Sequence, residues 1–504
     1  MALTIFVGIF FSPIIIRKLG PERYGVWILV FSMVDYFRFA GLGIRSAVVY
    51  YCARHYARRE MDELNRVMST GSFFYGCAAL FVLVAGGLVS LRFTSLFKIS
   101  PQYHEDTTIV VVVVLCSVAV RFLLMGFSAH LEALQRFDLI NRQYMAVLLF
   151  RSVCSVGALM LGYGLVALAW IAMIEASLEG SANWFVAHRV CPELRLSWTA
   201  VDFQALKRMA RFGAKSFVLS GAGVLLAQGP PSIIGHYLPV AFVGFYAVAV
   251  RTLSYCMEAV AKVGTITGSR SANLDAIGQH GQMAALATCI NRYCLALCLP
   301  LTIFMPIYGR ELFLHWLGPE YAIHSAPLLP MLVAAITVAW ASQFNAVAVL
   351  VGLGRHGRYA MVLILESVLI LSGSVLVVSR YGVPGVVWVV SVVMTLTRGV
   401  APAILFCSIY KISLLAYTRS VFLRPAWIGV PVAALMFWLK SVVLPGTGWG
   451  QLMLAGAITT GLCLVLTFRF VLAEEHRRRV TASGLLFMTT VRRAVWPGPR
   501  VTEH

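Results

Sequence analysis

The chain has 504 residues, of which 60% are hydrophobic and 12% are charged, and its mean hydropathy is +0.82. This composition excludes a large soluble enzyme and predicts an all-α protein that crosses a membrane many times. The net charge of +20 comes from Lys and Arg residues scattered between apolar segments, a distribution typical of membrane topology signals rather than of nucleic-acid binding.

About 14 apolar segments are long enough, at roughly 20 residues, to be predicted as transmembrane helices. The first is short, so either its end snorkels to the surface or the assigned start codon lies inside the real gene. A cleaved signal peptide fits poorly, because no basic region and no small-residue cleavage site precede Arg17-Lys18. The predicted spans are 2–16, 24–44, 68–91, 107–127, 143–161, 165–187, 213–235, 241–262, 289–308, 326–351, 359–379, 383–406, 425–443 and 451–472.

The segment 17–43 places charged residues inside an apolar helix. After a basic turn the chain passes Tyr24 and Trp27 and enters a helix that carries Asp35 and Arg38 at its middle. Ionisable side chains at such depth in a membrane are costly and usually face a cavity or a partner. We therefore interpret both as candidates for a functional site.

Three short motifs carry a family resemblance: L-G-P-E-R-Y-G at 19–25, L-E-A-L-Q-R-F-D at 131–138 and W-L-G-P-E-Y at 316–321. Together with the hydropathy pattern of nearly the whole chain, they resemble bacterial Wzx-type polysaccharide and O-antigen flippases, of the superfamily that also holds MATE drug exporters and lipid II flippases. The resemblance implies two pseudo-symmetric six-helix lobes plus two extra C-terminal helices. It also implies transport of a polyprenyl-diphosphate-linked oligosaccharide from the inner to the outer leaflet, with no cofactor and with membrane lipids and a polymerase or export machinery as further partners.

An internal repeat supports two lobes in the same membrane orientation. Parallel repeats of this kind are related by an axis along the membrane normal, with a site between them. The matches, at nearly the same offset, are Leu19 and Gly25 with Leu238 and Gly244, Leu131, Leu134 and Arg136 with Leu350, Leu353 and Arg355, and Tyr163-Gly164 with Tyr381-Gly382. The predicted division is an N-lobe at 1–187, a basic cytoplasmic linker at 188–212, a C-lobe at 213–407, helices 13 and 14 at 408–472 and a basic cytoplasmic tail at 473–504.

Most of the 41 Lys and Arg residues fall on one set of alternate loops, which predicts that both termini lie in the cytoplasm. In the linker, the run L-K-R-M-A-R-F-G at 206–213 indicates an amphipathic segment on the inner leaflet. The role of helices 13 and 14 stays open, between widening the lipid-facing side and contacting a partner.

The ionisable residues within predicted spans have two interpretations. In the first they only pair with one another, as Asp35 with Arg38 and Arg251 with Glu258. In the second, arginines line a cavity between the lobes and bind a diphosphate through bidentate bonds, while the carboxylates hold the arginines or take up coupling protons. The arginine candidates are Arg38, Arg251, Arg121 and Arg151, and the carboxylate candidates are Asp35, Glu175, Glu179, Glu258 and Glu366.

Gln228 is a further cavity candidate, because it precedes Gly229, Pro230 and Pro231 within a predicted span. Proline removes a backbone donor and clashes with the preceding turn, so a kink could turn freed carbonyls toward the cavity. A kink that serves packing alone is equally compatible with the sequence.

No nucleophile paired with a base and no nucleotide-binding motif occurs in the sequence, which favours a transporter over an enzyme. Cys294 and Cys298 share a helix face, but no histidine or carboxylate lies at ligand spacing, so we expect packing residues and no metal site. Two rivals stay open: a MATE-like cation-coupled drug exporter, which would need cavity carboxylates, and a membrane-embedded polysaccharide polymerase or glycosyltransferase.

Overall fold

The computed structural model describes residues 2–41, 43–254, 277, 279–352, 357–474 and 476–478. These residues are almost entirely helical, and they contain no strand beyond one isolated bridge between Lys98 and Pro239. Nine helices in this part of the chain are long and apolar enough to cross a membrane, or ten if a bent helix pair near the N-terminus is one span. The chain is thus an all-α, multi-pass membrane protein, while the count of about 14 spans stays a prediction.

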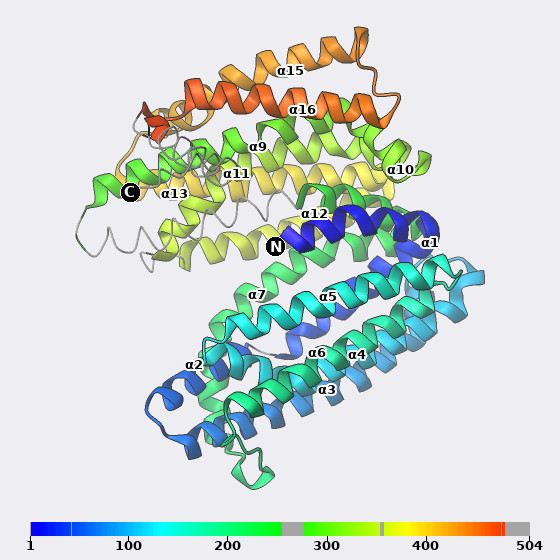
Figure 1. Ribbon diagram of the computed structural model, residues 1–504, viewed down its shortest axis with the longest axis vertical. Coiled ribbons are helices and arrows are strands. Elements are labelled where there is room, and N and C mark those ends of the chain that lie inside the picture. The colour runs from blue at the N-terminus through cyan, green and yellow to red at the C-terminus, as the bar shows by residue number, and fades with distance from the viewer. Residues whose placement is uncertain are drawn as a thin grey trace, which may run out of the picture. The chain divides into compact units, whose positions relative to one another are not determined.

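The chain divides into two compact units (Figure 1). The first comprises Met1–Tyr255, Leu312–Leu332 and Gly357–Thr397, and the second comprises the rest, so the units do not follow the predicted lobe boundaries. The lobe division therefore stays a prediction.

In chain order the helices are α1 (Ala2–Tyr36), α2 (Ile44–Ala57), α3 (Met61–Leu96), α4 (His104–Ala133), α5 (Phe137–Met160), α6 (Leu165–Val190), α7 (Phe203–Tyr237), a helix at Ala241–Ser254, α9 (His280–Trp316), α10 (Pro319–His324), α11 (Leu329–Gly352), α12 (Gly357–Met394), α13 (Ala401–Tyr410), α14 (Leu414–Thr418), α15 (Arg424–Val442) and α16 (Trp449–Leu466).

Two of the longest helices are each interrupted at a glycine. In α1 the break is at Gly20, with φ of 75°, and in α12 it is at Gly382, with φ of 60°. Both values lie in the left-handed region, which glycine adopts at no steric cost. The first break separates the predicted spans 2–16 and 24–44, and the second separates 359–379 and 383–406. Each of these helices therefore carries two predicted spans.

Glycines set the packing of the helix layer formed by α3, α4 and α6, in which α4 contacts both neighbours (Figure 1). A Cβ atom on Gly86 of α3 would lie 2.4 Å from the side chain of Leu115 on α4. A Cβ atom on Gly180 of α6 would lie 2.2 Å from the side chain of Leu124 on the same helix, α4. Small residues allow such close approach between helices in membranes, where no hydrophobic force pulls helices together.

A second glycine contact joins α1 to the helix at Ala241–Ser254. A Cβ atom on Gly25 would lie 2.1 Å from the carbonyl oxygen of Val240, and one on Gly244 would lie 3.2 Å from that of Pro21. In the predicted repeat Gly25 corresponds to Gly244, and Pro21 corresponds to Val240. The two contacts are therefore reciprocal, as a two-fold axis between the copies requires.

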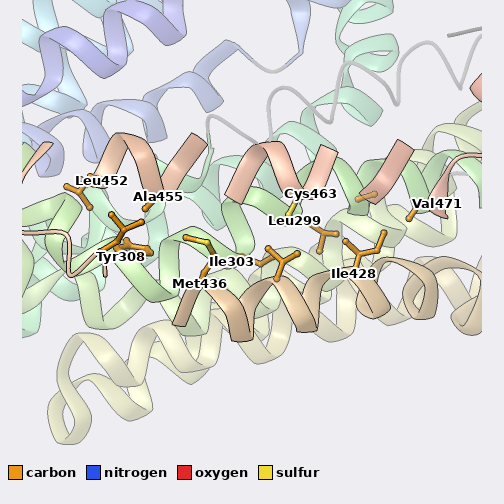
Figure 2. Close-up of a cluster of buried hydrophobic side chains, with 12 residues drawn as sticks. Leu299, Ile303, Tyr308, Ile428, Met436, Leu452, Ala455, Cys463 and Val471 are labelled. Atoms are coloured by element: carbon orange, nitrogen blue, oxygen red, sulfur yellow. The ribbon is translucent and has the colours of Figure 1, made fainter. Parts of the chain in front are cut away.

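In the second unit, α15 and α16 pack against α9 (Figure 2). The hydrophobic cluster includes Leu299 of α9, Met436 of α15 and Ala455 of α16. Lys440 of α15 adds an ion pair with Glu311 of α9, at 2.9 Å. The predicted helices 13 and 14 are therefore attached to α9 by both apolar and charged contacts.

The segment 188–212, predicted as the inter-lobe linker, includes the end of α6 and the start of α7, which begins at Phe203. Asp202 caps this helix, its side chain accepting a bond of 2.7 Å from the backbone N–H of Gln204, and that bond lowers the pKa of the carboxyl group. The run 206–213 is thus the first part of α7 and not a separate segment. Upstream, Asn65 of α3 donates to the carbonyl of Glu193 at 3.0 Å and ties the remaining linker to the first unit.

The Gly25 contact can be tested against a glycine with open space around it. Gly25→Ala should destabilise the protein by about 1–3 kcal/mol, because the methyl group would overlap a backbone carbonyl that cannot rotate away. Gly76→Ala on α3 is the control, since a Cβ atom added there would have nothing within 4 Å. This change should be neutral or should stabilise the helix by roughly 0.5–1 kcal/mol.

Thermal unfolding of both variants in detergent measures the difference. Equal melting temperatures for the two variants would show that α1 and the helix at Ala241–Ser254 do not meet at Gly25.

Candidate functional site

The first unit encloses a cavity of about 1180 Å³. Its walls come from α1, α2, α4, α5, α6, α7 and the helix at Ala241–Ser254. Within the part of the chain that the structure describes, arginines outnumber carboxylates in the lining. The charged lining residues are Arg45, Arg121, Arg151, Arg251, Asp35 and Glu175.

One carboxylate is shared by two of these arginines. Glu175 of α6 lies 3.5 Å from the guanidinium of Arg121 on α4 and 3.4 Å from that of Arg151 on α5. Arg121 also holds Glu179, one turn further along α6, at 2.7 Å. The Glu175 side chain is only 11% exposed, whereas the two arginine side chains are 38% and 46% exposed. All three side chains line the cavity, and the two arginine side chains are more exposed than the carboxylate that they share.

Helix packing sets this charge network. Leu124 lies one turn after Arg121 on α4, and the close contact of Gly180 with Leu124 brings α6 onto α4 at that level. Gly180 directly follows Glu179, so the glycine contact also positions the carboxylate opposite Arg121. Arg121 and Arg151, predicted as cavity candidates, and Glu175, predicted as a coupling or charge-pairing residue, all line the cavity. Their roles stay predictions, and nothing in the sequence pairs them with one another.

Arg45 lines the cavity but is not among the residues predicted from the sequence. A charge count places it in a cytoplasmic loop, because the predicted span ends at residue 44. Gly43, with φ of 69°, instead makes a tight turn from which α2 starts at Ile44, so Arg45 stands in the first turn of a new helix. Its guanidinium donates to Ser128 at 2.7 Å and to Glu132 at 2.8 Å. The apolar residues that follow Gly43 are the signal in the sequence from which a second helix beside the cavity could be predicted.

Asp35 and Gln228 meet across the cavity wall. The side-chain amide of Gln228 on α7 donates to the Asp35 carboxylate on α1 at 2.7 Å. α7 continues through Pro230 and Pro231, and the hydroxyl group of Ser232 donates to the Gln228 carbonyl at 2.8 Å. Gln228 lines the cavity, while its predicted role toward a substrate and the predicted kink stay predictions.

Two further carboxylate candidates do not join the described lining. Glu179 supports Arg121 without lining the cavity, and Glu366 is fully buried on α12, outside the lining. The sequence predicts both as coupling or charge-pairing residues; the pair of Glu179 with Arg121 is of that kind, and the role of Glu366 stays a prediction. The side chain of Arg38 and the whole of Glu258 lie outside the described residues, so the predicted position of Arg38 in the cavity lining stays a prediction. Arg251 does line the cavity.

The described residues contain no group of His, Cys, Asp and Glu side chains that could hold a metal ion. The arrangement offers guanidinium groups, carboxylates and an amide around a large space. Such a site can bind and orient an anionic ligand through charge-assisted hydrogen bonds.

Comparison with known sequences gives a consistent family. A profile of a family described as polysaccharide biosynthesis protein matches residues 14–325. A Shigella flexneri protein named for O-antigen transport is 22% identical over 397 residues, which covers 75% of this chain and 89% of that protein. The membrane protein EpsK of Bacillus subtilis strain 168 is 20% identical over 490 residues, covering 95% of this chain and 94% of EpsK.

Solved structures show the same fold. The lipid II flippase MurJ in an inward closed conformation matches with a TM-score of 0.72 at 10% identity, over 93% of this chain and 98% of MurJ. A multidrug resistance transporter of the MATE family in an inward-facing conformation matches with a TM-score of 0.64 at 12% identity, over 81% of this chain and 94% of that one. These likenesses confirm the predicted MATE-like, all-α fold.

Glu175→Gln tests the charge network. The amide keeps the shape of the side chain but removes the negative charge that two guanidinium groups share. We therefore expect the free energy of unfolding to fall by about 2 kcal/mol. Glu63→Gln is the control, because Glu63 pairs with Arg66 at 2.8 Å on an exposed surface. That change should cost less than about 1 kcal/mol.

The readout is thermal unfolding of each variant in detergent against the unaltered protein. If Glu175→Gln melts at the same temperature as Glu63→Gln, Glu175 does not neutralise Arg121 and Arg151.

Proposed function

Because the chain belongs to the polysaccharide biosynthesis protein family, we propose that it is a flippase for a polyprenyl-diphosphate-linked oligosaccharide. It moves this lipid from the inner to the outer leaflet of the bacterial cytoplasmic membrane, by alternating access and without covalent chemistry. The name of the Shigella relative and the fold shared with MurJ and MATE transporters are consistent with this proposal.

The charge of the cavity carries the proposal. Its arginines outnumber the carboxylates Asp35 and Glu175 in the described lining. A diphosphate is an anion, and the planar guanidinium group binds it through paired hydrogen bonds. A drug exporter that carries cations would need the opposite balance, so the cavity favours the flippase over that rival.

The size of the cavity fits the same task. At about 1180 Å³ it exceeds the roughly 300–1,000 Å³ of pockets for drug-sized ligands. A lipid-linked glycan needs room for its hydrated sugars and its diphosphate together, while its hydrocarbon tail can stay in the bilayer. We therefore place the head of the lipid in the cavity.

The proposal includes a membrane orientation with both termini in the cytoplasm. Reporter fusions or cysteine labelling near Arg92, Gly318 and Gly446 should report the periplasm, because Lys and Arg are sparse on that side. Positions near Arg58 and Arg208 should report the cytoplasm. A reversed pattern at two or more of these sites would refute the orientation.

Arginine-to-lysine changes test the diphosphate site. In cells that lack the gene, Arg121→Lys and Arg151→Lys should restore surface polysaccharide at least tenfold less well than the unaltered protein, because lysine keeps the charge but loses the bidentate fork. Arg142→Lys is the control, since Arg142 is exposed on α5 and does not line the cavity. Protein levels in the membrane should be equal for all variants.

The deletion itself decides the wider assignment. Cells that lack the gene should accumulate lipid-linked oligosaccharide on the inside and lose surface polysaccharide. Unchanged polysaccharide together with a new sensitivity to cationic dyes would instead identify a drug exporter.

A further inference from the structure

The cavity has two walls of different chemistry. Arg45, Arg121 and Arg151 line it from α2, α4 and α5. On α1, by contrast, Tyr24, Trp27 and Phe31 also line the cavity. These three aromatic residues are spaced three and four positions apart, so they share one face of the helix. The proposed diphosphate site accounts for the cationic wall but not for the aromatic one.

Trp27 and Phe31 form an aromatic surface on α1. The ring centroids of Trp27 and Phe31 are 4.5 Å apart with an interplanar angle of 54°. Both side chains are only half-buried, so part of each ring faces the cavity rather than another helix. Phe39, further along the chain, also lines the cavity and packs edge-on against Phe217 of α7, at 5.8 Å. A second aromatic pair, from the turn after α1 and from α7, thus also lines the cavity.

Polar groups stand directly beside the aromatic surface. Asp35 lies one turn beyond Phe31 on α1 and accepts the 2.7 Å bond from Gln228. A side-chain amide has two N–H groups and one carbonyl oxygen. Gln228 can therefore hold Asp35 and bond a ligand hydroxyl group at the same time. A carboxylate and an amide next to aromatic rings are what a hexose requires, because its C–H groups pack on the rings and its hydroxyl groups bond the polar pair.

A hydrocarbon tail fits this wall less well. Apolar chains match aromatic rings, but a tail lying there would cover Asp35 and Gln228 without offering them hydrogen bonds. Covering polar groups without replacing their bonds to water is unfavourable. A sugar ring satisfies both the apolar and the polar part of the wall.

We propose that Trp27 and Phe31, together with Asp35 and Gln228, form a subsite for a hexose ring of the transported glycan, separate from the arginines that hold the diphosphate. This inference rests on the proposed function and adds to it the place where sugar is recognised. Trp27, Phe31 and Asp35 follow the motif L-G-P-E-R-Y-G on α1, and Gln228 lies on α7.

The test compares two probes on the purified full-length protein in lipid nanodiscs. One probe is the lipid-linked glycan extracted from cells that lack this protein, and the other is polyprenyl diphosphate without sugar. Trp27→Ala should weaken binding of the glycan probe about tenfold and leave the sugarless probe unchanged. Trp27→Phe should recover most of the affinity, because it keeps an aromatic face, and Gln228→Ala should again weaken the glycan probe alone.

Trp170→Ala is the matched control, because Trp170 is 53% exposed on α6 and does not line the cavity. It should bind both probes like the unaltered protein, and a melting temperature for each variant checks that it is folded. Equal loss of both probes in Trp27→Ala, or loss of neither, would overturn the sugar subsite.

Failure of the proposed function looks different. If the unaltered protein binds neither probe, both the flippase assignment and the subsite are refuted. If it binds both probes with equal affinity, the diphosphate assignment stands and the sugar subsite is refuted.

Discussion

Charge neutralisation among apolar helices is the constraint on which the site depends. Guanidinium groups inside a membrane protein are tolerated only beside counter-charges, and here α6 supplies them to α4 and α5. That supply works only if the helices keep their register, which the contact of Gly180 with Leu124 sets. Helix packing thus positions the charged side chains of the cavity, and their ion pairs then stabilise them there. Arg121 and Arg151 can line the cavity because Glu175 lies beside both of them.

α1 combines several tasks that usually fall to different elements. Gly20 breaks the helix, and Gly25 lets it touch the backbone at Val240. The same helix then turns an aromatic face and Asp35 toward the cavity. A short motif can carry so much because a helix repeats every 3.6 residues, so one stretch serves packing on one side and a ligand on the other.

Much of this fold follows from composition and hydropathy, because lipid leaves the chain few alternatives to apolar helices. The same reasoning identifies Arg121 and Arg151, since an arginine within an apolar span is conspicuous. It fails at Arg45, which sits just past a glycine turn where a charge count expects a loop. It also fails to separate Glu175 from Glu366, because both are acidic residues in apolar helices and only the packing of those helices decides which one reaches the cavity.

Glu175 has a consequence for how long any anion stays. An anion that enters the cavity does not meet two bare cations but two that already share a carboxylate 3.4 Å and 3.5 Å away. Its net gain is the difference between its own bonds and those of Glu175, so the carboxylate acts as a resident competitor. Each reduction of the binding free energy by about 1.4 kcal/mol shortens the residence time of the anion about tenfold. Under the proposed function, Glu175 would remain beside both arginines when the anion departs, so release would not leave two uncompensated charges.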